Sequence, residues 1–420
     1  MRHLCNYRIS VLACVMVISL PVSQVPAAAP LAEKYLLEGK LAEGVKALQE
    51  RLKEAPKDDQ ARFGLGVVQF LQTFEHLGGN LHKYGLRTEK SFLRPPPQLK
   101  EFLPQNPHPE TLTYKAARQI LQTFLEDVVR AEATLAEVKD PAVKLPLHVG
   151  LIKIDPFGQN KPISAAFLFG RFTDAQTRQQ VEKFAIGFDR GDVSWLRGYC
   201  HILAAMGELL LAVDGQNAFE CGAHLLFEKV ETPHTFLLEN RRPFDNLGSA
   251  DVPVWSDVIS FFHQMTRLSI AEPDRTRAAL THLEAGLAQA KEMWKFILEE
   301  TDDDNEWIPN PKQTGVLGIK VTQEIVDSWR ETLEEAEQVI QGKKLIPFWR
   351  GKGGERGVNL RRVFTEPRTF DPIEWAQGTA ATPYLEKGSL TKFADPRVAD
   401  RLNKAFGGPS AFLGFGFWFN

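Results

Sequence analysis

The chain has 420 residues, a formal net charge of −3 at pH 7 and a hydrophobic content of 43%. A chain of this length and composition can bury a sizeable core, and we expect two or three lobes because one core rarely fills so many residues. The mildly acidic charge, without a dense basic run, argues against nucleic acid as the main partner.

The N-terminus has the pattern of an export signal. Arg2 and Arg8 form a positive end, the run ISVLACVMVISL at 9–20 carries no charge, and VPA at 25–27 offers small residues to a signal peptidase. The uncharged run is too short to span a bilayer as a helix. We therefore expect a signal peptide over 1–27, a periplasmic or secreted mature protein, and no transmembrane segment in it. The alternative is a cytoplasmic protein with an apolar N-terminus.

Residues 31–72 have strong helical spacing. Their pattern resembles the tetratricopeptide repeat in its small, leucine and proline positions, which are Gly39, Leu41, Gly44, Leu48, Pro56 and Leu65-Gly66. Arg51 and Arg62 depart from the repeat, and no later segment continues its period. Because so short a match cannot bury a solenoid core, we expect a tetratricopeptide-like helical hairpin region over 28–90 that packs on the helices after it.

A helical body is predicted over 91–342, beginning with a proline-rich irregular stretch at 91–110. Strand-like residues near 143–169 surround the turn DPFGQNK, which lacks the carboxylates of a calcium loop and is interpreted as a turn only. Loops are expected at 229–253 and 301–321. The predicted helices lie at 111–138, 174–188, 193–213, 217–228, 254–271, 274–300 and 322–341.

From residue 343 to 420 glycine, tryptophan and β-formers replace the long amphipathic pattern, which predicts a small α+β subdomain. The last nine residues, FLGFGFWFN, alternate aromatic residues at Phe415, Phe417 and Phe419, as a strand with one apolar face does. Since the rest of the chain is helical, this favours a buried terminal strand over a membrane barrel. The predicted fold class is mainly α, a multi-helix bundle of α-α hairpins.

Two cysteines, Cys200 and Cys221, remain after the signal, because Cys5 and Cys14 leave with it. In an oxidising compartment they can form a disulfide. Two buried thiols are the equal alternative.

The stretch 190–227 holds the densest polar groups on an apolar background. Arg197, His201 and Glu208 share one helix face, and His224 lies on the following helix. As a catalytic site, His201 would be a base or metal ligand, Glu208 a carboxylate, Arg197 an anion clamp and His224 a second imidazole. The alternative, which the pattern favours, is a structural network in which Arg197 pairs with Glu208 or another carboxylate. No metal motif is present, and we expect neither a metal nor a cofactor.

A second candidate, for ligand binding, is the acidic stretch at 299–316. Asp302, Asp303, Asp304 and Glu306 crowd a helix end where the dipole disfavours negative charge. We expect either a cation, or Arg and Lys side chains of another segment such as Arg361 and Arg362, to offset them. Trp307 would line a ligand cleft. The alternative is an exposed acidic linker.

Together with the signal and the stretches RGDVSWLRGYCH and EWIPNP, the hairpin makes the chain resemble uncharacterised exported bacterial families with a short tetratricopeptide-like start. The resemblance implies compartment and fold, and no activity. The sequence therefore favours a binding or scaffold protein of the cell envelope whose 31–138 helices dock a protein or envelope polymer. The alternative is an envelope hydrolase or lyase that uses Arg197, His201, Glu208 and His224.

Overall fold

The computed structural model describes residues 29–87, 105–170, 185–239, 252–303, 305–316, 318, 320–350 and 356–419. This part of the chain is mainly helical, which confirms the predicted class, and its strands are two or three residues long. Among the described helices, none combines the length and the apolar character needed to cross a bilayer.

The N-terminal helices form antiparallel neighbours around a tight turn. Gly39 ends the first helix with φ of 70°, a left-handed conformation that glycine adopts without strain. The Asp58 side chain accepts a hydrogen bond from Ala61 N and caps the third helix. The three helices are α1 (Leu31–Glu38), α2 (Leu41–Glu54) and α3 (Asp59–Lys83). The helical hairpin is present, and its relation to the tetratricopeptide repeat stays a prediction.

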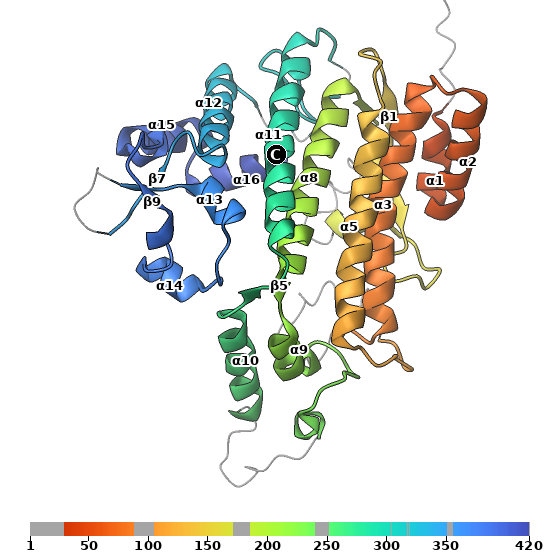
Figure 1. Cartoon of the computed structure of the whole chain (residues 1–420). Helices are drawn as coiled ribbons and strands as arrows, with labels where there is room; N and C mark the ends of the chain where they lie inside the picture. Colours follow the sequence, from red (N-terminus) through yellow and green to blue (C-terminus); the bar gives the residue numbers. More distant parts are fainter. Residues whose placement is uncertain are drawn as a thin grey trace, which may run out of the picture.

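Three long helices build the centre of the molecule: α5 (Tyr114–Ala136), α8 (Arg190–Ala212) and α11 (Pro273–Glu299). Helix α8 packs against α11 on one side and α5 on the other, and α3 runs beside α5 (Figure 1). Leu36, Phe63, Leu135 and Val193 are among the fully buried side chains that join α1–α3, α5 and α8 into the first hydrophobic core.

Short strands connect these helices. Strand β1 (Leu145–Leu147) pairs antiparallel with β4 (Ile186–Phe188), and β2 (Lys153–Ile154) pairs with β3 (Ile163–Ser164) around the predicted turn. A short helix, α6 (Ala165–Gly170), follows β3. The helix predicted at 174–188 is wrong at its end, where β4 pairs with β1; residues 174–184 lie outside the described part.

Beyond α8 the chain turns through β5 (Val213–Asp214), which pairs with β6 (Ser269–Ile270) just before α11. Between these strands lie α9 (Gln216–Gly222), the 3₁₀ helix η2 (Ala223–Leu225) and α10 (Val252–Met265). These elements lie at one end of the long helices (Figure 1).

The C-terminal elements lie on the opposite side of α11 from α5 (Figure 1). Helix α12 (Gln323–Ile340) packs on α11 and leads into a three-stranded sheet of order β7-β8-β9. The remaining elements there are β7 (Ile346–Pro347), β8 (Gly357–Val358), α13 (Leu360–Thr365), α14 (Pro372–Gln377), β9 (Leu385–Glu386) and α15 (Pro396–Phe406).

The chain ends in a helix, α16 (Pro409–Phe419), so the predicted terminal strand is wrong. The same residues that alternate along a strand also place Phe412, Phe415 and Phe419 at spacings of three and four, which is one helix face. Phe419 is fully buried, as the sequence predicts for the tail, and its ring centroid lies 4.8 Å from that of Trp294 and 5.8 Å from that of Trp329. The packing of α16 on α11 and α12 completes a second hydrophobic core.

Candidate functional site

Arg197 and His201 of α8 meet a carboxylate of α5. Arg197 Nε donates to Glu132 Oε1 at 2.9 Å, and His201 Nε2 lies 3.4 Å from the same oxygen. His201 Nδ1 in turn lies 3.1 Å from His282 Nδ1 of α11. The predicted face is therefore real, but Glu132 takes the place that the sequence offered to Glu208.

Electrostatic interactions within this group shift the pKa values of Glu132 and His282. Burial alone would raise the pKa of Glu132, but the hydrogen bond from His201 and the charge of Arg197 outweigh it and lower that pKa. Burial, with the nearby His201, lowers the pKa of His282. An imidazole pair joined through Nδ1 atoms needs one donor and one acceptor. One of the two Nδ1 atoms therefore donates and the other accepts, and the lowered pKa of His282 favours its neutral form.

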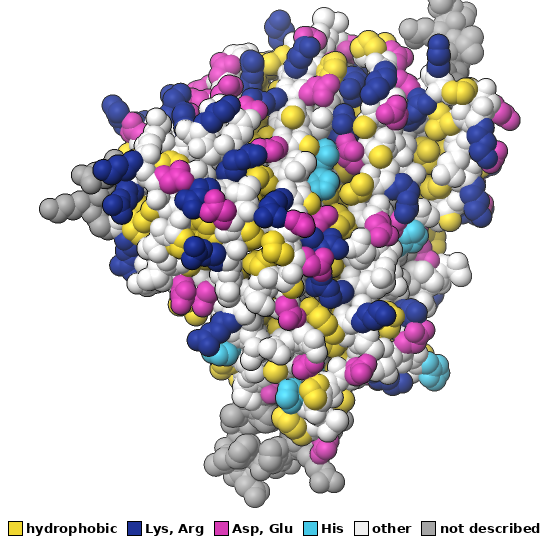
Figure 2. Space-filling model, viewed as in Figure 1, with side chains coloured by type: hydrophobic (Ala, Val, Ile, Leu, Met, Phe, Trp, Pro, Cys, Tyr) yellow, Lys and Arg dark blue, Asp and Glu magenta, His cyan; other side chains and the backbone are white. Residues whose placement is uncertain are grey.

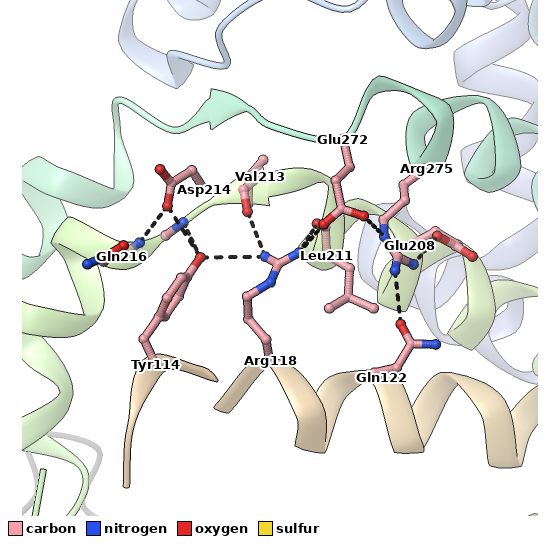
Figure 3. A network of polar contacts seen from close by, with 11 residues as sticks. Tyr114, Arg118, Gln122, Glu208, Leu211, Val213, Asp214, Gln216, Glu272 and Arg275 are labelled. Carbon is pink, nitrogen blue, oxygen red and sulfur yellow. Dashed lines mark hydrogen bonds and ion pairs between the residues drawn. The ribbon is translucent and has the colours of Figure 1, made fainter. Parts of the chain in front are cut away.

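Glu208 belongs to a second network on the same helix faces, shown in Figure 3. Arg275 of α11 donates from Nη1 to Glu208 at 2.9 Å and from Nη2 to Gln122 Oε1 at 3.0 Å. Its Nε donates to Glu272 at 2.6 Å, and Glu272 also accepts from Arg118 at 2.5 Å. Arg275 therefore binds Glu208. The alternative in which Arg197 pairs with Glu208 is wrong, because Arg197 binds Glu132.

Arg118 connects this network to the C-terminal end of α8 (Figure 3). Its guanidinium donates to the carbonyl oxygens of Leu211 at 2.7 Å and Val213 at 3.0 Å. A cation at this end of a helix is favoured by the helix dipole. Tyr114 adds a hydrogen bond from Gly215 N to its hydroxyl oxygen at 2.9 Å. The two networks together form a polar seam, defined here by Glu132, Arg197, His201, His282, Glu208, Arg275, Gln122, Arg118, Glu272 and Tyr114.

His224 does not join the polar seam. It lies on η2, and its Nε2 is 3.3 Å from Asp257 Oδ2 of α10. The prediction that His224 supplies a second imidazole beside His201 is wrong; His282, which the sequence interpretation passed over, occupies that place.

The acidic stretch also finds partners other than those predicted. Lys144 Nζ lies 2.7 Å from Asp302 Oδ2, and Asp303 accepts a hydrogen bond from Thr314 N at 2.7 Å. Asp304 lies outside the described residues. Arg361 and Arg362 do not offset these acids, because their guanidinium groups bind Glu284 and the pair Glu366 and Glu386, respectively.

Glu306 enters a buried acidic cluster at the start of α8. One carboxylate oxygen each of Glu306, Asp189 and Glu300 lie within 4.8 Å of one another. Asp189 caps α8 through Gly191 N at 2.8 Å, and Asp192 accepts a hydrogen bond from Asp189 N at 3.0 Å. Oxygen ligands of this kind suit a hard divalent cation, but helix capping and hydrogen bonds account for Asp189 and Asp192.

Burial and neighbouring charges raise the pKa of two carboxyl groups in and beside this cluster. Burial first, and then the charge of Asp189, raises the pKa of Asp192 well above its usual value. The same two causes raise the pKa of Glu300 to about 9. Glu300 is therefore protonated at neutral pH, and its neighbour Gln313 donates to Glu300 Oε2 at 3.2 Å.

Trp307 is an anchor of the second core. Its ring centroid lies 5.7 Å from that of Trp195 and 6.4 Å from that of Trp418. Trp195 Nε1 donates to the carbonyl oxygen of Trp418 at 2.8 Å. Trp307 therefore contacts α8 and α16 through its ring, in addition to following the acidic stretch in sequence.

Cys200 and Cys221 are free thiols. Cys200 is fully buried in the first core, where burial raises its thiol pKa, and Cys221 is partly buried on α9.

Two apolar cavities lie at the end of α8 that is remote from the acidic cluster. The α8–α13 cavity has a volume of about 430 Å³ and is lined by Leu209, Leu210, Phe364, Phe370, Trp375 and Ala380, among others. The α5–α9 cavity has a volume of about 320 Å³ and is lined by side chains of α3, α5, α9 and α10. Leu210, Val213, Met265 and Leu268 line both and separate them.

The rim of the α8–α13 cavity is apolar and reaches solvent. Leu210 is 50% exposed and Phe370 46% exposed, although both carry large apolar side chains. On the face seen in Figure 2, apolar side chains surface near the lower end of α11 among intermixed basic and acidic ones. An apolar rim around a concave apolar site is typical of ligand-binding surfaces.

Comparison with protein-family models finds no match, and neither the curated proteins nor the solved structures contain a protein similar enough to match this chain.

Proposed function

We propose that this protein is an exported helical binding protein of the cell envelope and that the α8–α13 cavity is its ligand site. The cavity carries the proposal. Its volume of about 430 Å³ falls in the range of small-molecule sites, roughly 300–1,000 Å³. Its lining is apolar with few polar groups, which favours binding of an apolar ligand over hydrolysis.

Export is supported by the N-terminal pattern of Arg2, Arg8 and the uncharged run at 9–20. Export can be tested by fractionating cells that express the full chain with a C-terminal tag and measuring the mass of the tagged protein. The processed protein is expected in the periplasmic or extracellular fraction, with the mass of a chain that begins after Ala27. An unprocessed chain in the cytoplasm would contradict export. It would not affect the proposal that the α8–α13 cavity binds a ligand.

The hydrolase or lyase alternative has less support from the geometry. Arg197 and His201 face Glu132 and His282, so their hydrogen-bonding groups are used within the polar seam. Glu208 is bound by Arg275. Arg197 and His201 both contact Glu132, and His201 also contacts His282. Few of their hydrogen-bonding groups are therefore available to a substrate.

Fluorescence of N-phenyl-1-naphthylamine, an uncharged apolar probe, tests the binding site on the mature chain. Saturable enhancement is expected, and Ala380→Phe should abolish it by filling the cavity that Ala380 lines. Ala376→Phe is the matched control, because Ala376 is exposed on α14 and does not line the cavity. Thermal unfolding shows whether both variants fold. An absence of saturable enhancement, or equal enhancement in both folded variants, would overturn the proposal.

A further inference from the structure

The α8–α13 cavity has almost no polar group available to a ligand. Thr276 Oγ1 lies 2.7 Å from the carbonyl oxygen of Pro273 and 2.6 Å from that of Phe364. Tyr384 donates its hydroxyl to the carbonyl oxygen of Glu366 at 3.1 Å. Trp375 and Tyr384 stack at 5.9 Å with an interplanar angle of 10° and present apolar ring surface. The interior of the cavity therefore suits a hydrocarbon chain.

One charged side chain, Arg368, lines the same cavity and is exposed, which places it at the mouth. Within the described part of the chain its guanidinium has no hydrogen bond and no ion pair. The nearby Arg362 differs, because it binds both oxygens of Glu366 and one of Glu386. Hydrogen bonds from Arg362, and then the charges of Arg362 and Arg368, lower the pKa of Glu366. Arg368 thus acts on Glu366 through its charge alone, and its guanidinium donors stay available beside an apolar cavity.

Resting on the proposed binding function, we propose that the α8–α13 cavity binds a fatty-acid anion, with its hydrocarbon chain inside and its carboxylate on Arg368. A guanidinium binds a carboxylate through two parallel hydrogen bonds, which gives an anionic head group both affinity and orientation. The hydrocarbon tail of the ligand adds to the affinity because it leaves water, and each buried methylene strengthens binding about fourfold. The charge of Arg368 and the apolar lining of the cavity thus favour the same amphiphile.

Isothermal titration calorimetry of the mature chain tests this inference. The ligands are dodecanoate, hexanoate and dodecyltrimethylammonium, each below its critical micelle concentration. Dodecanoate is expected to bind at one site. Hexanoate should bind at least a hundredfold more weakly, because it lacks six methylenes worth about fourfold each. Dodecyltrimethylammonium has the same hydrocarbon chain with a cationic head group. Its affinity should be at least about tenfold lower than that of dodecanoate.

Arg368→Gln should weaken dodecanoate binding about tenfold, the size of a lost charge-assisted contact, while N-phenyl-1-naphthylamine still binds. Arg397→Gln is the matched control, because Arg397 is exposed on α15 and, among the described residues, pairs with Asp395 alone. If the probe binds but both dodecyl amphiphiles bind equally and Arg368→Gln changes nothing, the head-group inference is wrong and the binding function stands. If neither the probe nor dodecanoate binds, both are wrong.

Discussion

His201 Nδ1 lies 3.1 Å from His282 Nδ1 at the contact between α8 and α11. The pair links two helices that contact each other along most of their length, and Glu132 joins α5 to it through His201. Its charge state therefore affects how three central helices dock.

The His282 side chain should make stability depend on pH. A histidine whose pKa is lower in the folded chain binds fewer protons when folded, so its contribution is full above the unfolded pKa of about 6.5 and falls as the pH drops through it. We expect His282→Gln to reduce the loss of unfolding free energy between pH 7.5 and 5.5 by on the order of 0.5 kcal/mol, since the site is only partly buried. Urea unfolding at both pH values measures it. His108→Gln, on an exposed residue, should leave the wild-type difference unchanged.

Glu300 should act in the opposite direction. Its pKa of about 9 in the folded chain exceeds the usual 4.5, so its contribution is full below about pH 4.5 and is lost as the pH rises toward 9. Glu300→Gln keeps an amide of the same shape beside Gln313 and should raise the unfolding free energy at pH 8 by on the order of 1 kcal/mol. Glu299→Gln, on the exposed neighbouring residue, is the control. A Glu300→Gln variant that is less stable at pH 8 would show that its carboxylate is needed, as in a cation site.

Glu132 is the carboxylate that makes Arg197 and His201 compatible with partial burial. Glu132→Gln leaves Arg197 without an anion and should destabilise the fold by about 2–4 kcal/mol, measured by denaturant unfolding. Glu137→Gln changes an exposed residue just beyond α5 and should cost less than about 0.5 kcal/mol. In the double variant Glu132→Gln/Arg197→Gln the cost should fall short of the sum of the two single costs, because the two groups interact. Additive costs would mean that the pair does not interact.

Phe419 should be a major contributor to the second core. Phe419→Ala removes a fully buried ring and should lower the unfolding free energy by about 3–5 kcal/mol. Phe393→Ala removes a ring that is 37% exposed on the same side of the molecule and should cost about 1 kcal/mol. Equal, small costs would show that α16 is not packed on α11 and α12.

The sequence predicted the long helices well because their apolar residues recur at helical spacing over many turns. The predicted 274–300 and 322–341 correspond to α11 at Pro273–Glu299 and α12 at Gln323–Ile340. It failed for α16, where the aromatic residues fit both a strand and a helix and only packing on Trp329 decides between them. Short, ambiguous segments depend on tertiary contacts that local pattern does not contain.

The site residues show the same limit. Spacing on one helix correctly placed Arg197 and His201 together, because positions four apart share a face. Their partners Glu132 and His282 lie 65 and 81 residues away in sequence, and no local pattern encodes such pairs. The α8–α13 cavity was missed for a related reason. The uninterrupted apolar run LLLAV at 209–213 is typical of a buried segment, yet Leu210 is half exposed at the cavity rim.

A crystal structure of the mature chain soaked with a brominated apolar probe tests most directly whether the α8–α13 cavity binds a ligand. We expect anomalous bromine density inside the α8–α13 cavity, between Leu210 of α8 and Trp375 of α14, at full or nearly full occupancy. Density only at other sites, or a cavity closed by the repacking of these side chains, would contradict it.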